Sequence, residues 1–201
     1  MDTRIAIALL HCFLFTTLVQ SAPVSSPSAL PPAFREAAER AKTLVEKILG
    51  DIPAVHAAAI TTEGLTLSGS MQTSNLQMMV TSLGIPPAPV LKPLSERFSL
   101  DTCVQRMLAG GQLYQGLLGV LSDRLGGLKD LRADLRDLLT HITKMKEAAQ
   151  LSSPDQNQIL DLDPLDDTFK LQVAAHVTLT RLRSFCHDLI RSLRAAAAYR
   201  P

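Results

Sequence analysis

The stretch 128–145, LKDLRADLRDLLTHITKM, decides the fold class of this chain. Its large apolar residues recur at alternating spacings of three and four, which predicts a helix that packs one stripe against neighbouring helices. Charged side chains occupy the positions between them, so the opposite face is expected to meet water. The stripe consists of Leu128, Leu131, Leu135, Leu138, Ile142 and Met145, and the charged residues outside it are Arg132, Asp134, Arg136 and Asp137.

Only a short turn around Gly126-Gly127 separates this helix from a preceding one, which the apolar pattern predicts from about Leu94 to Leu121. A second glycine pair, Gly110-Gly111, lies inside that helix and costs it roughly 2 kcal/mol relative to alanine. The pair therefore indicates a kink or the close approach of another helix. The residues expected to face the core are Phe98, Cys103, Val104, Met107, Leu108, Leu113, Leu117, Leu118 and Leu121.

Two further helices are predicted on either side of this central pair. The first begins at Pro32, which suits a first helical turn, and is expected to end near Ile48 because Gly50 and Pro53 follow. The last is expected from about 167 to Ala198. Their apolar stripes are Phe34, Ala37, Ala38, Ala41, Leu44, Val45 and Ile48 in the first, and Leu171, Ala175, Leu179, Leu182, Cys186, Leu189 and Leu193 in the last.

The lengths of the connections predict how these four helices are ordered. The segments 51–93 and 151–166 are long, whereas the central connection is a short turn. Two long crossovers are typical of an up-up-down-down four-helix bundle, since an up-down-up-down bundle needs short loops throughout. We therefore predict an all-α up-up-down-down four-helix bundle with two long crossover loops, the first holding a short helix with Leu76, Met78, Met79 and Leu83 that ends at Gly84.

The first 21 residues are typical of a secretory signal peptide. Arg4 precedes an apolar run from Ile5 to Leu14, and Val19-Gln20-Ser21 supplies the residues expected before a cleavage site. A membrane anchor is the alternative, but the run is about half of the roughly 20 residues that a spanning helix needs. We expect residues 1–21 to be removed and residues 22–201 to form a single secreted, extracellular domain.

Charge and cysteine content narrow the possible partners. Without Asp2 and Arg4 the chain keeps 19 basic and 18 acidic residues, and this balance argues against nucleic acid or an anionic membrane as the main partner. No later apolar segment reaches spanning length, so no membrane insertion is expected. Cys12 leaves with the signal peptide, so at most one bridge is expected. The second and fourth helices are neighbours in the predicted topology, so Cys103 and Cys186 either pair as a disulfide or pack as small apolar residues.

No pattern in the sequence indicates catalysis. His56, His141, His176 and His187 occur singly, outside any His-Glu-x-x-His or Cys-x-x-Cys motif. The glycines from Gly110 to Gly116 are flanked by leucines rather than by a strand, which argues against a nucleotide loop. We therefore expect no enzyme, no cofactor and no metal site.

Two peptides carry a resemblance to a known family. Residues 82–89 read SLGIPPAP, and residues 113–118 read LYQGLL. Both resemble, at the same separation, peptides of the granulocyte colony-stimulating factor family in the interleukin-6 group of long-chain helical cytokines. Further similarity lies at Leu30-Pro31, Phe34, Lys47-Ile48, Gly50-Asp51, Asp134, Asp137 and Ser184-Phe185, so it covers essentially the whole mature chain.

The resemblance implies a secreted growth factor that brings class I cytokine receptor chains together and drives granulocyte-lineage proliferation, differentiation and survival. The free protein is expected to be a monomer. Carried over by position, the family's principal receptor site falls on Arg40, Lys47, Asp134 and Asp137, and its second site falls on Asn75, Leu76 and Met78.

The chain also departs from the family pattern. An acidic residue of the principal site falls at Thr43, where Glu39 and Glu46 lie one turn to either side and are candidate substitutes. An acidic residue of the second site falls at Asn75. The family's two disulfides are not conserved in this chain, because Leu65, Met71 and Pro93 stand where cysteines would be needed and Cys103 is left alone.

Two alternatives remain open at the level of sequence. One is a sibling cytokine of interleukin-6 type. The other is an apolipoprotein-like lipid carrier, which would use broad apolar helix faces with basic borders. The narrow stripe of the helix at 128–145 favours a closed bundle over such a carrier.

Overall fold

The computed structural model describes residues 30–67, 74–95, 97–151, 165 and 167–199, which belong to one compact unit. Four long helices form a bundle: α2 (Pro32–Ala59), α4 (Leu100–Ser122), α5 (Leu128–Ala148) and α6 (Thr168–Ala197). A short fifth helix, α3 (Ser74–Ser82), lies in the first crossover and packs against α6. The short helix predicted before Gly84 is thereby confirmed.

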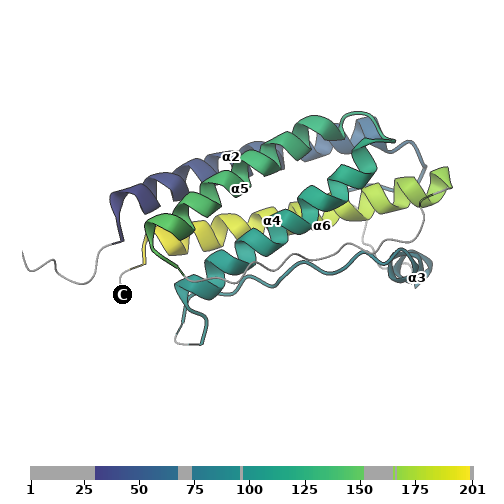
Figure 1. Cartoon of the computed structure of the whole chain (residues 1–201). Helices are drawn as coiled ribbons and strands as arrows, with labels where there is room; N and C mark the ends of the chain where they lie inside the picture. The colour runs from purple at the N-terminus through teal and green to yellow at the C-terminus, as the bar shows by residue number, and fades with distance from the viewer. Residues whose placement is uncertain (1–29, 68–73, 96, 152–164, 166, 200–201) are drawn as a thin grey trace, which may run out of the picture. The chain divides into compact units, whose positions relative to one another are not determined.

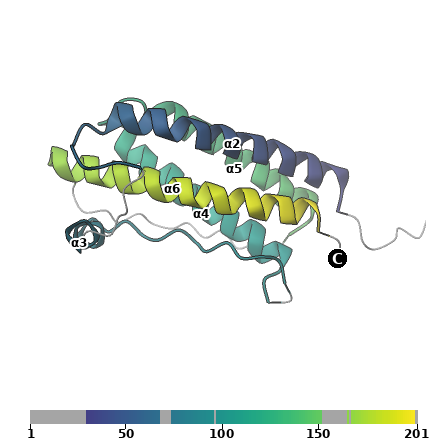
Figure 2. The same ribbon diagram turned by 180° about the vertical axis from the view of Figure 1, so that it is seen from behind.

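The bundle has the predicted up-up-down-down topology. Helices α2 and α4 run in one direction and α5 and α6 in the other, as both views show (Figures 1 and 2). Helix α2 packs between α5 and α6, and α4 packs between the same two helices on the other side. Every packed pair of long helices is therefore antiparallel.

Helix α5 matches its sequence prediction most closely. All six residues of its predicted stripe are buried, and Gly127 precedes the helix with a φ of 83°, a conformation that glycine adopts without strain. In α6 the seven predicted core residues are likewise buried. Asp167 caps this helix, because its carboxylate accepts a hydrogen bond from the Phe169 amide at 3.1 Å.

The predicted end of the first helix is wrong. Helix α2 continues past Gly50 and Pro53 to Ala59. Pro53 leaves the carbonyl of the residue four positions earlier without its usual donor, but Ile52, His56 and Ala59 extend the buried stripe by about three more turns. Tertiary packing of this stripe therefore outweighs a local signal to stop.

The predicted start of the second helix is also wrong. Helix α4 begins at Leu100 rather than near Leu94, because Ser99 caps it by accepting a hydrogen bond from the Thr102 amide at 3.2 Å. Ser95 and Phe98 exchange backbone hydrogen bonds just before this cap. The Arg106 guanidinium lies 5.3 Å from the centre of the Phe98 ring, which fixes the entry to the helix.

The glycine pair in α4 marks two close helix contacts, one of the two outcomes predicted for it. A methyl group on Gly110 would lie 2.4 Å from the Phe185 ring of α6, and one on Gly111 would lie 2.8 Å from Leu139 of α5. The absence of side chains at these two positions lets α4 approach both neighbours.

A buried histidine pair connects α2 to α6. His56 and His176 lie in contact, with Nε2 of the first 2.9 Å from Nδ1 of the second, and their side chains are almost fully buried. One turn before His176, the Gln172 side chain accepts hydrogen bonds from the amides of Thr61 and Thr62. These polar contacts hold the start of the first crossover against α6.

Candidate functional site

Helices α2 and α5 face each other in a regular antiparallel register. Lys47 of α2 contacts Asp134 of α5. Seven residues earlier in α2 and seven residues later in α5, Arg40 lies beside His141. Another heptad brings Ala33 opposite Ala148. The charged residues that the sequence predicted on two separate helices are thus brought onto one surface.

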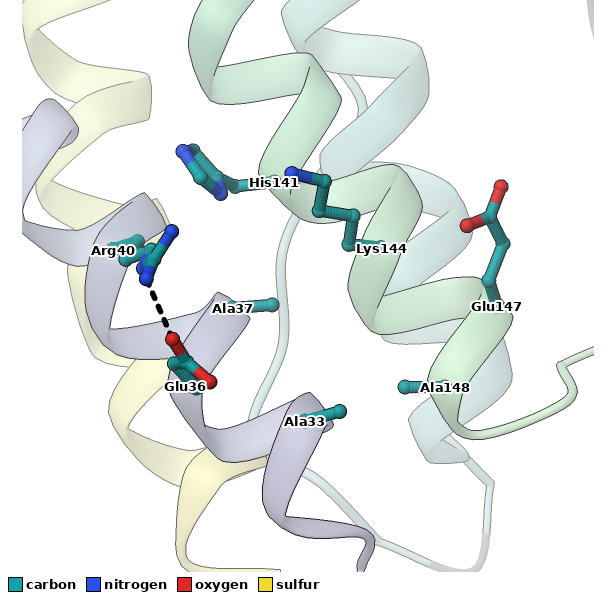
Figure 3. Close-up of a pocket in the computed structure, with 8 residues that line it drawn as sticks. All are labelled: Ala33, Glu36, Ala37, Arg40, His141, Lys144, Glu147 and Ala148. Atoms are coloured by element: carbon teal, nitrogen blue, oxygen red, sulfur yellow. Dashed lines mark hydrogen bonds and ion pairs between the residues drawn. The ribbon is translucent and has the colours of Figure 1, made fainter.

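A groove runs along this surface in two connected parts. One part has a volume of about 370 Å³ and is shown in Figure 3, where His141 and Lys144 extend from α5 toward α2. The other part, of about 460 Å³, shares Arg40, His141 and Lys144 with the first and adds Thr43 and Asp137. We call the two parts together the α2/α5 groove.

Arg40 lies at the centre of the groove. Its guanidinium pairs with the Glu36 carboxylate at 2.6 Å, and both side chains are well exposed (Figure 3). An exposed pair of this kind adds little to stability, because water screens it and both side chains lose freedom. Arg40 is therefore available to a partner.

Asp134 and Lys47 form the ion pair that closes one end of the surface. Asp134 is only 16% exposed, whereas Lys47 is about half exposed and also pairs with Asp51 at 3.2 Å. The hydrogen bond to Asp134, with a smaller contribution from Asp51, raises the pKa of Lys47 above its usual value. Asp134 thus links α5 to α2 in addition to lining the surface.

Asp137 is placed differently from Asp134. Its side chain is 60% exposed, and its nearest cation is its own neighbour Arg136 at 3.7 Å. It lines the groove beside Thr43. Of the two aspartates predicted on this helix, Asp137 is the one whose carboxylate is mostly exposed to solvent.

Glu39 and Glu46, the candidate substitutes for an acidic residue at position 43, do not line the groove. Glu39 pairs with Lys42 at 2.8 Å, and Glu46 lies 3.8 Å from Arg194 of α6. Thr43 itself donates its hydroxyl to the Glu39 carbonyl and contributes no charge to the groove.

Four titratable groove residues were missed by the sequence prediction: Glu36, His141, Lys144 and Glu147. The signal for them was helical spacing, because His141 and Lys144 follow Asp137 by four and seven positions, Glu147 follows Lys144 by three, and Glu36 precedes Arg40 by four. Partial burial, with smaller contributions from Lys144 and Arg40, lowers the pKa of His141. The imidazole is therefore neutral at physiological pH.

The second predicted site lies on α3. Met78 is 65% exposed, the largest exposed fraction among the large apolar side chains in the described part of the chain. The side chains of Asn75 and Leu76 lie outside the described part of the structure, as do the predicted signal peptide and most of the second crossover.

Cys103 and Cys186 are buried free thiols in the structure, so the possible bridge between them is absent. The helix register gives the reason. Cys103 hydrogen-bonds Ser192, while Phe185 lies against Gly110, so Cys186 sits level with a residue about six positions beyond Cys103. Six residues of helix span about 9 Å, more than the Cα separation that a disulfide allows.

This arrangement predicts two thiols that react slowly in the folded protein. Burial raises the pKa of Cys103 to about 11 and that of Cys186 to about 12, so neither forms a thiolate near neutral pH. Titration with an aromatic disulfide reagent should detect almost no thiol in native protein and two in unreduced protein unfolded in guanidinium. Finding no thiol after unfolding would establish the bridge instead.

Within the described residues, no three His, Cys, Asp or Glu side chains gather as a metal ion would require. Within the same ranges, no helix is both long enough and apolar enough to cross a membrane.

The two family-like peptides belong to the scaffold. Leu83 and Ile85 are buried, and the Ile85 carbonyl accepts a hydrogen bond from Arg181 of α6 at 3.1 Å. In the second peptide Tyr114 is buried against Phe185, with ring centres 5.4 Å apart, and the three leucines join the core. These peptides fix the first crossover and α4 rather than form a binding surface.

Comparison with known proteins supports the resemblance. No protein-family model matches the chain. Curated granulocyte colony-stimulating factors do match it: that of Homo sapiens is 28% identical over 193 residues, covering 94% of this chain and 90% of the relative. That of Sus scrofa is 27% identical over 185 residues, covering 89% of each chain, and that of Bos taurus is 29% identical over 129 residues, covering 61% and 65%. The chain is therefore similar to granulocyte colony-stimulating factor along almost its whole length.

Proposed function

We propose that this protein is a secreted cytokine of the granulocyte colony-stimulating factor type. The observation that carries the proposal is similarity over nine-tenths of the chain to relatives of that name, on a helical bundle of the kind expected for a long-chain cytokine. It acts without catalysis, by holding class I cytokine receptor chains together, and it drives proliferation, differentiation and survival of granulocyte-lineage cells.

The principal receptor surface is the α2/α5 groove. Arg40 and Asp137 are exposed there, and Lys47 and Asp134 continue the same surface. Charges of both signs alternate across the two helices, which suits a protein partner with a complementary pattern and favours specificity over non-specific attraction. The alanines between the charges leave room for side chains of the partner.

The second surface is α3, where Asn75, Leu76 and Met78 receive another receptor chain. The exposed thioether of Met78 supports this assignment, because methionine is flexible and adapts to irregular apolar surfaces. The free cytokine is a monomer, and two surfaces on one rigid body set the distance between the receptor chains.

Binding to purified receptor ectodomains tests this function. The folded protein, without residues 1–21, should bind the ectodomain of the granulocyte colony-stimulating factor receptor and not that of the interleukin-6 receptor. It should also support growth of cells that depend on the former receptor. Binding only to the interleukin-6 receptor would indicate the sibling cytokine, and flotation with liposomes without receptor binding would indicate the lipid carrier.

A further inference from the structure

Helix α5 carries two separate stripes of opposite charge. Three cations follow spacings of three and four, and three carboxylates follow spacings of four and three, starting one residue later. Since successive residues turn by about 100°, the two stripes lie on different flanks of the helix. The cations are Lys129, Arg132 and Arg136, and the carboxylates are Asp130, Asp134 and Asp137.

The two charged flanks of α5 face different neighbouring helices. Asp134 and Asp137 lie toward α2, as described above. The three cations line a groove of about 370 Å³ between α5 and α4, two helices that pack against each other and lie side by side in Figure 1. We call this second hollow the α4/α5 groove.

The α4/α5 groove has a net positive lining. Three cations and the single carboxylate of Asp123 give a formal charge of +2 among the described residues that line it, and Gln115 and Ser122 add polar groups. The α2/α5 groove differs, because Glu36, Asp137 and Glu147 balance its cations. A surface with a net positive charge favours an anionic partner over a protein surface of mixed charge.

Two of the three cations make no ion pair within the described part of the chain. Arg136 lies 3.7 Å from Asp137, but Lys129 and Arg132 have no such partner. Lys129 also stands in the first turn of α5, where the helix dipole disfavours a positive charge. Helix stability therefore does not explain the basic stripe.

Gly119 of α4 lies directly against Arg132, the central cation of the basic stripe. A methyl group at this position would lie 3.3 to 3.5 Å from the Nη2, Cζ and Nε atoms of Arg132, so the guanidinium lies over a backbone without a side chain. Arg132 is exposed to solvent on its other side. A planar guanidinium held in this way presents paired N–H donors to an anionic oxygen group.

We propose that the α4/α5 groove binds a sulfated polysaccharide of the extracellular matrix. From Lys129 to Arg136 the cations extend about 10 Å along the helix, so they meet successive sulfates of an extended chain rather than a single ion. The choice of a matrix polyanion rests on the secretion included in the proposed function. The groove lies on a different flank of α5 from the receptor surface, so one molecule binds both partners.

The test compares two double variants with equal loss of charge. Lys129→Gln/Arg132→Gln removes the unpaired cations of the groove, and Lys170→Gln/Arg183→Gln removes one exposed lysine and one exposed arginine from α6. Binding of the full mature chain to immobilised heparin is measured at an ionic strength of about 0.15 M, where charges beyond about 8 Å are screened. Fully desulfated heparin serves as the control surface.

We expect the groove variant to bind heparin roughly tenfold more weakly than the wild type, the α6 variant to bind like the wild type, and all three to ignore desulfated heparin. Equal weakening in both variants would show attraction by net charge alone and overturn the proposal. Failure of the wild type to bind heparin would overturn it as well. If the groove variant lost receptor binding but still bound heparin like the wild type, the groove would be assigned to a protein partner instead. Because heparin binding is measured without receptor, a failure of this proposal can be distinguished from a failure of the proposed receptor function.

Discussion

Replacing Gly110 by alanine is expected to lower the free energy of unfolding by about 2 kcal/mol, although alanine is the better helix former. The new methyl group would lie 2.4 Å from the Phe185 ring. That ring is buried and packed against Tyr114, so it has no open space to move into. Urea unfolding should show the loss as a lower midpoint with an unchanged slope, and the melting temperature should fall by about 4–8 °C.

Gly50 provides the matched control for this substitution. It also lies within a long helix, but no atom comes within 4 Å of the position its methyl group would occupy. Gly50→Ala should therefore raise stability by about 0.5–1 kcal/mol. The double variant Gly110→Ala/Phe185→Leu should be more stable than the sum of its single changes predicts. If both glycine substitutions were stabilising, the close contact between α4 and α6 would be wrong.

Acidification is expected to loosen the contact between α2 and α6 through the His56–His176 pair. Burial lowers the pKa of both histidines below 6.5, and the charge of His56 further lowers that of His176. The unfolded chain therefore binds protons more readily than the folded one. The contribution of the neutral pair to the free energy of unfolding is fully present above about pH 6.5 and decreases as the pH falls below it. When both rings are protonated neither nitrogen can accept, and their hydrogen bond is lost.

Thermal melting between pH 7.5 and 5 measures this effect. The loss of a buried hydrogen bond with both groups left buried corresponds to about 1–3 kcal/mol. His56→Gln/His176→Gln should reduce the pH dependence, while His187→Gln, which changes an exposed histidine on the same helix, should leave it unchanged. The pKa of His141 is lowered as well, so the variant His141→Gln is needed to subtract the contribution of this residue to the pH dependence. A wild-type melting temperature that stays constant over this range would contradict the assignment.

The helices could be predicted from the sequence where periodicity and capping agree. Residues 128–145 have an unbroken heptad stripe after a glycine pair, and α5 starts at the predicted residue. At Pro53 the local and tertiary preferences conflict, and the buried contacts of Ile52 and His56 decide that the helix continues. The start of α4 depended on the cap at Ser99, which the apolar pattern alone did not reveal.

The candidate site could be predicted only in part, because sequence reveals helix faces but not the register between helices. Arg40 and Asp137 could be placed on exposed faces, and the structure brings them to one groove. Two other features depend on how the helices pack: Asp134 is mostly buried where it contacts Lys47, and Glu46 lies toward α6. The same limit explains the absent bridge, since the offset between Cys103 and Cys186 is a property of the α4–α6 register.

The affinity of an Asp137 variant for the receptor tests most directly the claim that the α2/α5 groove receives the receptor. Asp137→Ala removes an exposed carboxylate beside an arginine, and Asp188→Ala, its control, removes one beside an arginine on α6. By surface plasmon resonance, the first variant should bind the granulocyte colony-stimulating factor receptor ectodomain at least about tenfold more weakly, about 1.4 kcal/mol, with an unchanged melting temperature. The control should bind like the wild type. Equal affinities for wild type and Asp137→Ala would contradict the account.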